Sequence, residues 1–466
     1  MARLPLVKRM AYQDPLELMA KLCGKDKFLL HSGLVTEEIG RYSFLGCDPF
    51  LVLQAKDEKV TITEGNSEKL IEGNPIRELR KILQRFYRPL TAAVPFTGGA
   101  VGYFAYDLGW LFEELPHATD DDLKLPDFYL PFYDRVIVVD HFKKETLVFS
   151  HGFPLTDGEG ESRAEMRIDE LLKMLRSEHP SLEQITNEIA AGDLSSNFTR
   201  DQYLNMVRQG KEYIAAGDIF QVNLSQRLQV PLYISPWQLY LRLAKLNPAP
   251  FAAFLDFQPA AVVSASPERF MRLQGDRVET RPIKGTRPRG CNPIEDERLR
   301  EELINSAKDR AELVMIVDLA RNDLGRVCRV GTVKVPRVFR LEEYATVFHL
   351  VSTVEGTLSP ALDICDLITA SFPGGSITGA PKIRAMEIIE ELEPTKRGIY
   401  TGSIGYIDFS GDADSNIVIR TFVIKNGTAY FQVGGGIVAD SSPEAEYQET
   451  LDKAKALLDS LGKIGG

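Results

Sequence analysis

The sequence predicts an α+β protein built from layers of strands and helices, and three observations support this class. The chain has 466 residues, which at roughly 100–200 residues per domain is enough for two or three domains and a sizeable core. Short runs with strand-like alternation and longer amphipathic runs occur along the chain. The two kinds of run interleave without strict βαβ order, which favours α+β layers over a doubly wound sheet.

The composition narrows the function. The chain is 44% hydrophobic and 26% charged, which is typical of a globular protein, and its formal net charge is −11. A nucleic-acid partner is disfavoured because a polyanion requires a basic face. No apolar run approaches the length of a membrane helix, and the N-terminus has no apolar stretch before a small-residue cleavage site. We therefore expect a cytoplasmic protein without membrane association.

The cysteines are odd in number and widely scattered, which indicates neither a disulfide framework nor a zinc ribbon. We expect each to be a small buried thiol. They are Cys23, Cys47, Cys291, Cys328 and Cys365.

The N-terminal region, residues 1–155, contains short strands, turns and one helical stretch over 75–86. Its glycine-rich run over 97–103 lacks the spacings of a phosphate loop, so it indicates a tight turn or a strand bulge. Residues 156–197 are polar and predict a linker that carries a surface helix. The apolar positions of that helix are Ile168, Leu171, Leu172 and Leu175.

The C-terminal region, residues 198–462, begins with the capping box Thr199–Gln202 of a helix that ends at Gly217. A strand over 220–230 follows, in which apolar residues, starting with Phe220, alternate with polar residues that could face a cleft. Further strands are predicted over 251–257, 260–265, 417–424 and 429–433, and helices over 293–305, 309–322, 381–392 and 443–461.

Two of these helices carry acid pairs. Asp309 and Glu312 are three residues apart, as are Glu446 and Glu449, and Lys453 follows Glu449 by four. Each pair is either a solvated helix face or a seat for a hard cation. Magnesium suits carboxylate oxygens that leave room for water, whereas zinc prefers His or Cys ligands.

Lys284 lies in a segment whose prolines and glycines fix the backbone around one amine. This segment is either a basic surface turn or the site of a nucleophile. In the second interpretation, partial desolvation and the neighbouring Arg281, Arg287 and Arg289 disfavour the ammonium form.

Glu268 ends a predicted strand and is either a general acid or base or the partner of a cation such as Arg269. His349, between apolar residues, is either a satisfied core histidine or a group that polarises a substrate oxygen. Backbone amides over 372–382 and at Gly434–Gly436, which we expect after a strand, could bind a carboxylate.

Taken together, the ordered segments resemble the chorismate-utilising enzymes, the family of the large subunits of aminodeoxychorismate and anthranilate synthases. The segments are GDIFQVNLSQR, SASPERF, ETRPIKGTRPRG, KDRAELVMIVDLARNDLGRV, FHLVSTVEG, SFPGGSITGAPK, RGIYTGSIGY, NIVIRTF and VGGGIVADSSPEAEYQETLDKAKAL. The runs at 40–46 and 98–103 extend the resemblance toward the N-terminus. It implies two layered lobes in which antiparallel sheets pack face to face with helices on the outside.

One side chain favours the aminodeoxychorismate branch: the sequence reads PIKGT, with Lys284, where anthranilate synthases typically read PIAGT. Leu29–Ser32 and Asn247–Phe251 also depart from the pattern of the tryptophan-inhibited relatives. We therefore expect no feedback inhibition by tryptophan, and the alternative of a tryptophan bound in a structural role stays open. The candidate tryptophan pocket comprises Ser32, Pro250 and Phe251.

The resemblance also implies roles for individual residues. Glu312 and Glu449 resemble direct Mg²⁺ ligands, and Asp309 and Glu446 resemble holders of metal-bound water, although the family more often has Glu where Asp309 stands. Gln221 stands where water-using relatives place a lysine base. The residues that resemble substrate-binding groups are Thr286, His349, Tyr400, Arg420, Gly434, Gly435, Gly436 and Lys453.

The implied reaction is the amination of chorismate to 4-amino-4-deoxychorismate for 4-aminobenzoate and folate biosynthesis. Lys284 is the expected covalent nucleophile and Glu268 the expected acid. No cysteine lies in the G-x-C-x-G elbow of a glutaminase, so we expect a glutamine amidotransferase partner to supply ammonia. The alternatives are anthranilate synthesis and a non-catalytic metabolite sensor, although retained acids without catalytic use would be electrostatically costly.

Overall fold

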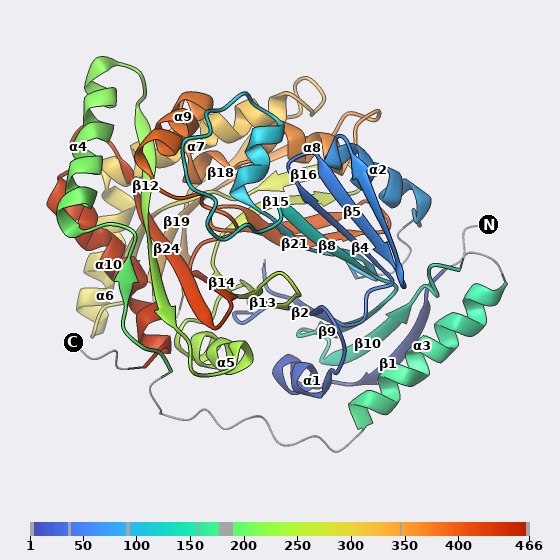
Figure 1. Cartoon of the computed structure of the whole chain (residues 1–466). Helices are drawn as coiled ribbons and strands as arrows, with labels where there is room; N and C mark the ends of the chain where they lie inside the picture. Colours follow the sequence, from blue (N-terminus) through green and yellow to red (C-terminus); the bar gives the residue numbers. More distant parts are fainter. Residues whose placement is uncertain are drawn as a thin grey trace.

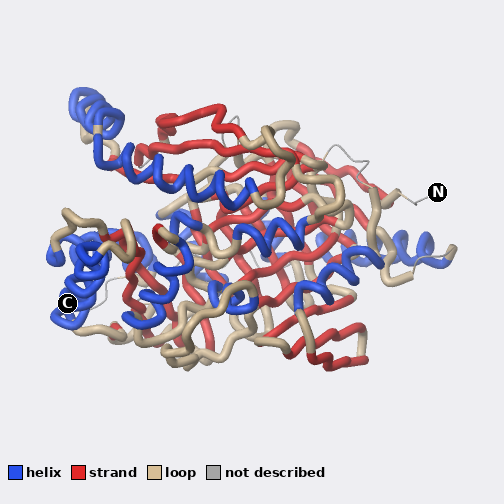
Figure 2. Tube along the Cα trace, turned by 90° about the horizontal axis from the view of Figure 1, so that it is seen from above, coloured by secondary structure: helices blue, strands red, loops and turns tan. Residues whose placement is uncertain are grey.

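Two large antiparallel sheets form the centre of the molecule, and most helices lie around them (Figures 1 and 2). The structure is a computed structural model that describes residues 4–35, 39–89, 94–155, 158–176, 190–344 and 347–462. Each sheet has twelve described strands, and all their pairings are antiparallel. The predicted fold class is confirmed.

In the first sheet eleven strands pair one after another, and the short strand β20 pairs with β12 outside this row. Its order is β1 (Leu6–Ala11), β10 (Glu145–Ser150), β9 (Arg135–Asp140), β3 (Tyr42–Gly46), β2 (Lys27–His31), β13 (Phe251–Asp256), β14 (Ala261–Ser266), β23 (Thr421–Lys425), β24 (Thr428–Ile437), β12 (Gln221–Pro231) and β11 (Ser195–Ser196), with β20 at Gly379–Ala380.

In the second sheet eleven strands also pair one after another, and β18 pairs with β19 outside this row. Its order is β17 (Ile283–Pro288), β19 (Val347–Thr357), β16 (Arg277–Thr280), β15 (Arg269–Gln274), β22 (Ala413–Ile417), β21 (Ser403–Asp408), β7 (Gly99–Phe104), β8 (Phe128–Tyr133), β4 (Leu51–Lys56), β5 (Lys59–Glu64) and β6 (Ser67–Glu72), with β18 at Lys334–Glu343.

The helices cover the outer faces and ends of the sheets. They are α1 (Pro15–Lys21), α2 (Pro75–Arg85), α3 (Glu159–Arg176), α4 (Arg200–Ala216), α5 (Pro236–Leu246), α6 (Pro293–Asn305), α7 (Ala307–Gly325), α8 (Ile364–Ser371), α9 (Lys382–Leu392) and α10 (Pro443–Ser460), with 3₁₀ turns η1 (Tyr106–Leu111) and η2 (Gly375–Ile377).

Aromatic side chains join the two sheets face to face. Phe44 of β3 and Tyr406 of β21 are both buried, and their ring centroids lie 5.3 Å apart. Tyr103 of β7 and Phe28 of β2 belong to the same buried cluster. Rings of this size bury a large apolar area, so this layer fixes how the sheets sit on each other.

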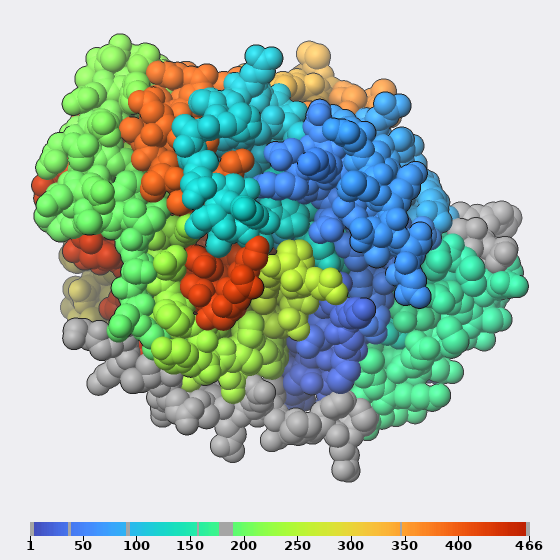
Figure 3. All heavy atoms as spheres, viewed as in Figure 1, coloured from blue at the N-terminus to red at the C-terminus, as the bar shows by residue number. Residues whose placement is uncertain are grey.

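Each sheet takes strands from both ends of the chain. In the first sheet β2 pairs with β13, and in the second β7 pairs with β21. Figure 3 shows cyan atoms from the N-terminal region lying against orange and red atoms from the C-terminal region, where Asp120 bridges to Thr395. The predicted boundaries at 155 and 198 remain a prediction about sequence regions, and 156–157 and 177–189 lie outside the described residues.

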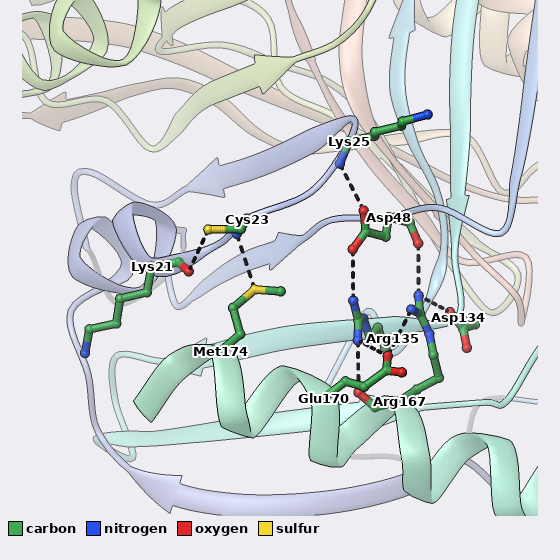
Figure 4. Close-up of polar contacts among 9 residues, drawn as sticks. All are labelled: Lys21, Cys23, Lys25, Asp48, Asp134, Arg135, Arg167, Glu170 and Met174. Carbon is green, nitrogen blue, oxygen red and sulfur yellow. Dashed lines mark hydrogen bonds and ion pairs between the residues drawn. The ribbon is translucent and has the colours of Figure 1, made fainter. Parts of the chain in front are cut away.

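Helix α3, on the segment predicted to be a linker, is held by a polar network on its inner side (Figure 4). Arg135 of β9 is 3% exposed and pairs with Asp48 and Glu170, each at 3.1 Å. Arg167 of α3 pairs with Asp134 at 3.2 Å. The predicted apolar stripe of α3 is buried in the same region.

The structure corrects the predicted strand over 417–424. It is two strands, β22 and β23, separated at 418–420, where Arg420 has φ +52°. Phe220 lies just before β12 and is 74% exposed, so its predicted burial is wrong. The chain turns from α4 into the strand at this point, which leaves Phe220 outside the sheet.

The glycine-rich run over 97–103 also differs from expectation, because most of it forms the interior strand β7 rather than a turn. A Cβ at Gly102 would lie 2.0 Å from the carbonyl oxygen of Tyr129, so glycine permits the close strand approach. Cys23 and Cys291 are exposed, which corrects the prediction of burial, and all five cysteines are free. Across the described chain, the helices are too short or too polar to cross a membrane.

Candidate active site

Lys284 of β17 faces carboxylates from two helices and one loop. Burial lowers the pKa of its amine. The negative charge of Glu312 on α7 opposes this shift, the positive charge of Lys453 on α10 adds to it, and Glu268 and Glu449 also act on the amine. The structure therefore brings the predicted nucleophile, the predicted acid and two predicted metal ligands together.

The arginines near Lys284 in sequence do not account for its lowered pKa, which corrects that interpretation. Arg281 pairs with Glu342, and Arg289 pairs with Asp296 at 2.6 Å. Arg287 pairs with Glu302 at 2.7 Å and with Asp309 at 3.1 Å. Each positive charge is thus balanced by an acid.

Glu268 is buried between β14 and β15, with 6% exposure. Burial raises the pKa of its carboxyl to about 7, although a hydrogen bond from Ser376, 2.8 Å from Oε1, and the charge of Lys284 act in the opposite direction. The salt bridge with Arg269 is not formed, because that guanidinium pairs with Asp414 and Glu279. A buried carboxyl that titrates near neutrality can donate a proton to a substrate.

The four predicted metal-binding acids lie on two helices, as expected. Burial raises the pKa of Glu312, and the charges of Asp309 and Glu449 raise it further. Burial also acts to raise the pKa of Glu449, but Lys453, 2.6 Å away, together with Lys284 and Lys308, outweighs burial and leaves this pKa below the usual range. Among the described residues, no three acids, histidines or cysteines are already gathered around one point.

The donor set nevertheless fits a hard cation such as Mg²⁺. Oε2 of Glu446 is buried without a hydrogen-bond partner in the described part of the chain. A Cβ at Gly435 would lie 3.0 Å from that oxygen and 3.5 Å from Oε1 of Glu449, so both carboxylates approach the same point of β24. Magnesium keeps several waters and needs few protein oxygens.

Arg420 occupies the break between β22 and β23. Burial lowers the pKa of its guanidinium, and none of the carboxylates described here lies within ion-pair distance of it. The charge of Arg420 also acts on His349, whose pKa is lowered to about 3, mainly by burial. A neutral His349 beside a cation without an acid partner suits a site for an anionic ligand.

The other predicted substrate-binding groups contact, or act electrostatically on, residues of the same site. Thr286 Oγ1 lies 2.9 Å from Nδ1 of His349, and Lys453 donates to the carbonyl oxygen of Gly434 at 2.9 Å. Tyr400 and the acids Glu446 and Glu449 all act electrostatically on the buried Tyr203.

Residues 434–436 lie within β24 rather than after a strand, which corrects that expectation. Their one described strand neighbour is β12, because β23 pairs with β24 only as far as Phe431. Their opposite edge therefore has no strand pairing in the described chain.

Three polar groups at the site were not among the predicted site residues. Gln221 is fully buried, and neither amide atom has a partner among the residues described. It lies against Gly436, where an added Cβ would be 2.7 Å from Nε2. Tyr203 and Ser376 are the other two. The family resemblance had already singled out Gln221 as the position where water-using relatives place a lysine base, but no sequence pattern marks the hydroxyls of Tyr203 and Ser376.

A cavity of about 460 Å³, which Lys284 does not line, lies between the two sheets. Ser32, Pro250 and Phe251, the candidate tryptophan pocket, all line it. Arg41 and Asp414 add charged groups to its wall. The structure thus groups these three residues, while the identity of a ligand remains a prediction.

Comparison with known proteins places these features in a family. The family model described as chorismate binding enzyme matches residues 29–459. Aminodeoxychorismate synthase component 1 of Escherichia coli (strain K12) is 43% identical, with 93% of each chain covered. Anthranilate synthase component 1 of Acetivibrio thermocellus is 41% identical, covering 94% of this chain and 90% of that one.

A solved structure of a related enzyme has a similar fold. Anthranilate synthase component I from Streptococcus pneumoniae TIGR4 superposes with a TM-score of 0.81 at 32% identity, covering 96% of this chain and 98% of that one. The chain belongs to the chorismate binding enzyme family, as the sequence segments predicted.

Proposed function

We propose that this protein is an aminodeoxychorismate synthase that converts chorismate and ammonia into 4-amino-4-deoxychorismate and water. The observation that carries the proposal is Lys284, whose amine has a lowered pKa and lies near the buried carboxyl of Glu268. A nucleophile and an acid with pKa values shifted toward each other suit a covalent substitution. Relatives named aminodeoxychorismate synthase component 1, with 43% and 41% identity, support the assignment.

The reaction begins with the neutral amine of Lys284. Its lone pair forms a bond to C2 of the ring, the two conjugated ring double bonds (C1=C2 and C5=C6) shift to C6=C1 and C4=C5, and the C4 hydroxyl leaves as water with the proton of Glu268. Ammonia then forms a bond to C4, the two double bonds return to C5=C6 and C1=C2, and the C2–Nζ bond breaks, which returns Lys284 as an amine. The carboxylate of Glu268 takes the surplus proton from the new amino group and is ready for the next turnover.

Glu312 and Glu449 are the residues that would hold Mg²⁺ directly, with Glu446 and Asp309 on bound water. The ion would supply positive charge for the ring carboxylate of chorismate. Arg420 is placed to accept a second carboxylate, because it has no acid partner in the described part of the protein.

The ammonia source in this proposal is a glutamine amidotransferase subunit, and the product feeds 4-aminobenzoate and folate synthesis in the cytoplasm. A partner is consistent with relatives named as a component 1. The alternative, anthranilate synthesis, is supported by relatives such as the Acetivibrio thermocellus protein. Lys284 weighs against it, because anthranilate synthases typically have alanine there.

One assay separates these functions. The pure chain is incubated with chorismate, Mg²⁺ and an ammonium salt at alkaline pH, with and without an aminodeoxychorismate lyase. We expect 4-aminobenzoate only when the lyase is present. Anthranilate without lyase would contradict the proposal, and unconsumed chorismate would favour a metabolite sensor.

A further inference from the structure

A small cavity of about 30 Å³ lies beside Glu268. The residues with polar or charged side chains that line it are Glu268, Arg269, Thr280, Asp323, Ser371 and Ser376. A cavity that holds one water needs roughly 10–15 Å³ by this kind of measure, so this one has room for one or two molecules of that size. Ammonia fits, and a chorismate ring does not.

The cavity contains a hydroxyl group that lacks a partner. Ser371, at the end of α8, is 2% exposed, and its Oγ forms no hydrogen bond within the described structure. An unsatisfied buried polar group is costly, which indicates a small polar ligand in this space.

The charges around the cavity favour a hydrogen-bond donor. Asp323 pairs with Lys382 at 2.6 Å, and the same ammonium group donates to the carbonyl oxygen of Ser371 at 3.0 Å. The guanidinium of Arg269, which also lines the cavity, pairs with Asp414 and Glu279. After Glu268 has given its proton to the leaving hydroxyl, the carboxylates of Glu268 and Asp323 both line the cavity, and Lys382 balances that of Asp323. Ammonia, with three N–H groups, suits such oxygens.

We propose that this cavity is the chamber in which ammonia waits beside Glu268 before it attacks C4. The inference rests on the proposed function. The nitrogen lone pair forms the C4–N bond as the bond between C2 and Lys284 Nζ breaks, and one N–H proton passes to the Glu268 carboxylate. The chamber supplies ammonia from the side where the hydroxyl left as water.

The test uses Ser371→Val, which removes the hydroxyl and fills the cavity, and Ser371→Ala, which only removes the hydroxyl. Ser403→Val is a matched control. Ser403 is also 2% exposed with an Oγ that has no partner in the described chain, and it lines a different cavity of about 30 Å³.

Two quantities are measured on the full-length chain. One is the KM for ammonium chloride in amination, and the other is the rate at which the Lys284 adduct appears by mass spectrometry without ammonium. We expect Ser371→Val to raise the KM for ammonium about tenfold, and Ser371→Ala by a smaller factor. Adduct formation should stay within about twofold of wild type in both variants, and Ser403→Val should change neither quantity.

An unchanged KM for ammonium in folded Ser371 variants would mean that the cavity holds only water and would overturn the proposal. A parallel loss of adduct formation would also overturn it, because Ser371 would then act by positioning Glu268. If Ser371→Val does not fold, Ser371→Ala decides. Failure of the proposed function is distinguishable, because wild-type protein would then form neither adduct nor aminodeoxychorismate.

Discussion

At the scale of single residues, the proposed chemistry depends on Lys284. Its amine must be neutral to attack, and burial shifts its pKa in the required direction. Neither serine nor water can form the same adduct at this position, so the loss of this side chain cannot be compensated locally.

We expect Lys284→Ala to abolish covalent labelling and to slow amination by at least about 10³-fold, since the nucleophile is lost. Intact mass after incubation with chorismate and Mg²⁺, but no ammonium, should show one chorismate less one water on wild type only. Lys455→Ala, an exposed position on α10, is the control. Full activity in Lys284→Ala would rule out the nucleophile role.

Glu268 should set the alkaline side of the pH profile. Its pKa is raised to about 7, so the protonated acid that the first step needs is present below this pH and is lost as pH rises through it. Lys284 must lose a proton to become a nucleophile, which rising pH favours, so the rate of adduct formation should pass through a maximum with pH.

Glu268→Gln should lower the rate of adduct formation about 10²-fold and remove the fall in rate at alkaline pH. An alkaline limb that persists in this variant would exclude Glu268 as the acid.

At the scale of secondary-structure elements, Gly435 of β24 leaves room for the carboxylates of Glu446 and Glu449 on α10 to approach the strand. Gly435→Ala would place a Cβ 3.0 Å from Oε2 of Glu446 and push this carboxylate aside. We expect the Mg²⁺ concentration for half-maximal activity to rise about tenfold. Gly325→Ala, at the end of α7 with open space around its Cα, is the control. Equal Mg²⁺ dependence in both variants would argue against this placement.

Arg135 contributes to the attachment of helix α3, together with the Arg167–Asp134 pair and the buried apolar stripe of the helix. Arg135→Ala would leave Asp48 and Glu170 without their shared cation, and we expect a loss of about 2 kcal/mol in the free energy of unfolding. Arg321→Ala removes an exposed pair with Asp318 and should cost less than about 1 kcal/mol. Urea denaturation measures both. If Arg135→Ala lowered the free energy of unfolding as little as Arg321→Ala does, the Arg135 network would contribute little to stability.

At the scale of the whole molecule, the interleaving of the two chain regions in both sheets has a consequence for folding. A fragment of residues 198–462 would lack β2 and β7, which leaves β13 and β21 with unpaired edges. We expect this fragment not to unfold cooperatively when it is produced alone, as judged by circular dichroism during heating. A cooperative transition would show an independent domain.

Local pattern was sufficient for much of the fold. The helix predicted over 293–305 matches α6 at both ends, because the Asn292 cap, Pro293 at the first helical position and acids in the first turn mark its start locally. The break at Arg420 was not predictable, because a positive φ in an arginine reflects tertiary contacts rather than propensity.

In the site, too, local pattern predicted some features, whereas contacts between distant segments determine others. Acid pairs three residues apart identified the helix faces, and the family resemblance identified Lys284 and Glu268. The pairing of Asp309 with Arg287, the orphan hydroxyl of Ser371 and the cavity between the sheets arise from contacts between distant segments. No periodicity within one segment encodes them.

The position of the new nitrogen in the product tests the central proposal most directly. The pure chain is incubated with chorismate, Mg²⁺ and ¹⁵N-labelled ammonium, and the product is examined by NMR. We predict ¹⁵N bound to C4 of a ring that keeps its enolpyruvyl group. Label on C2 of an aromatic ring without that group would identify anthranilate synthesis and contradict the proposed function.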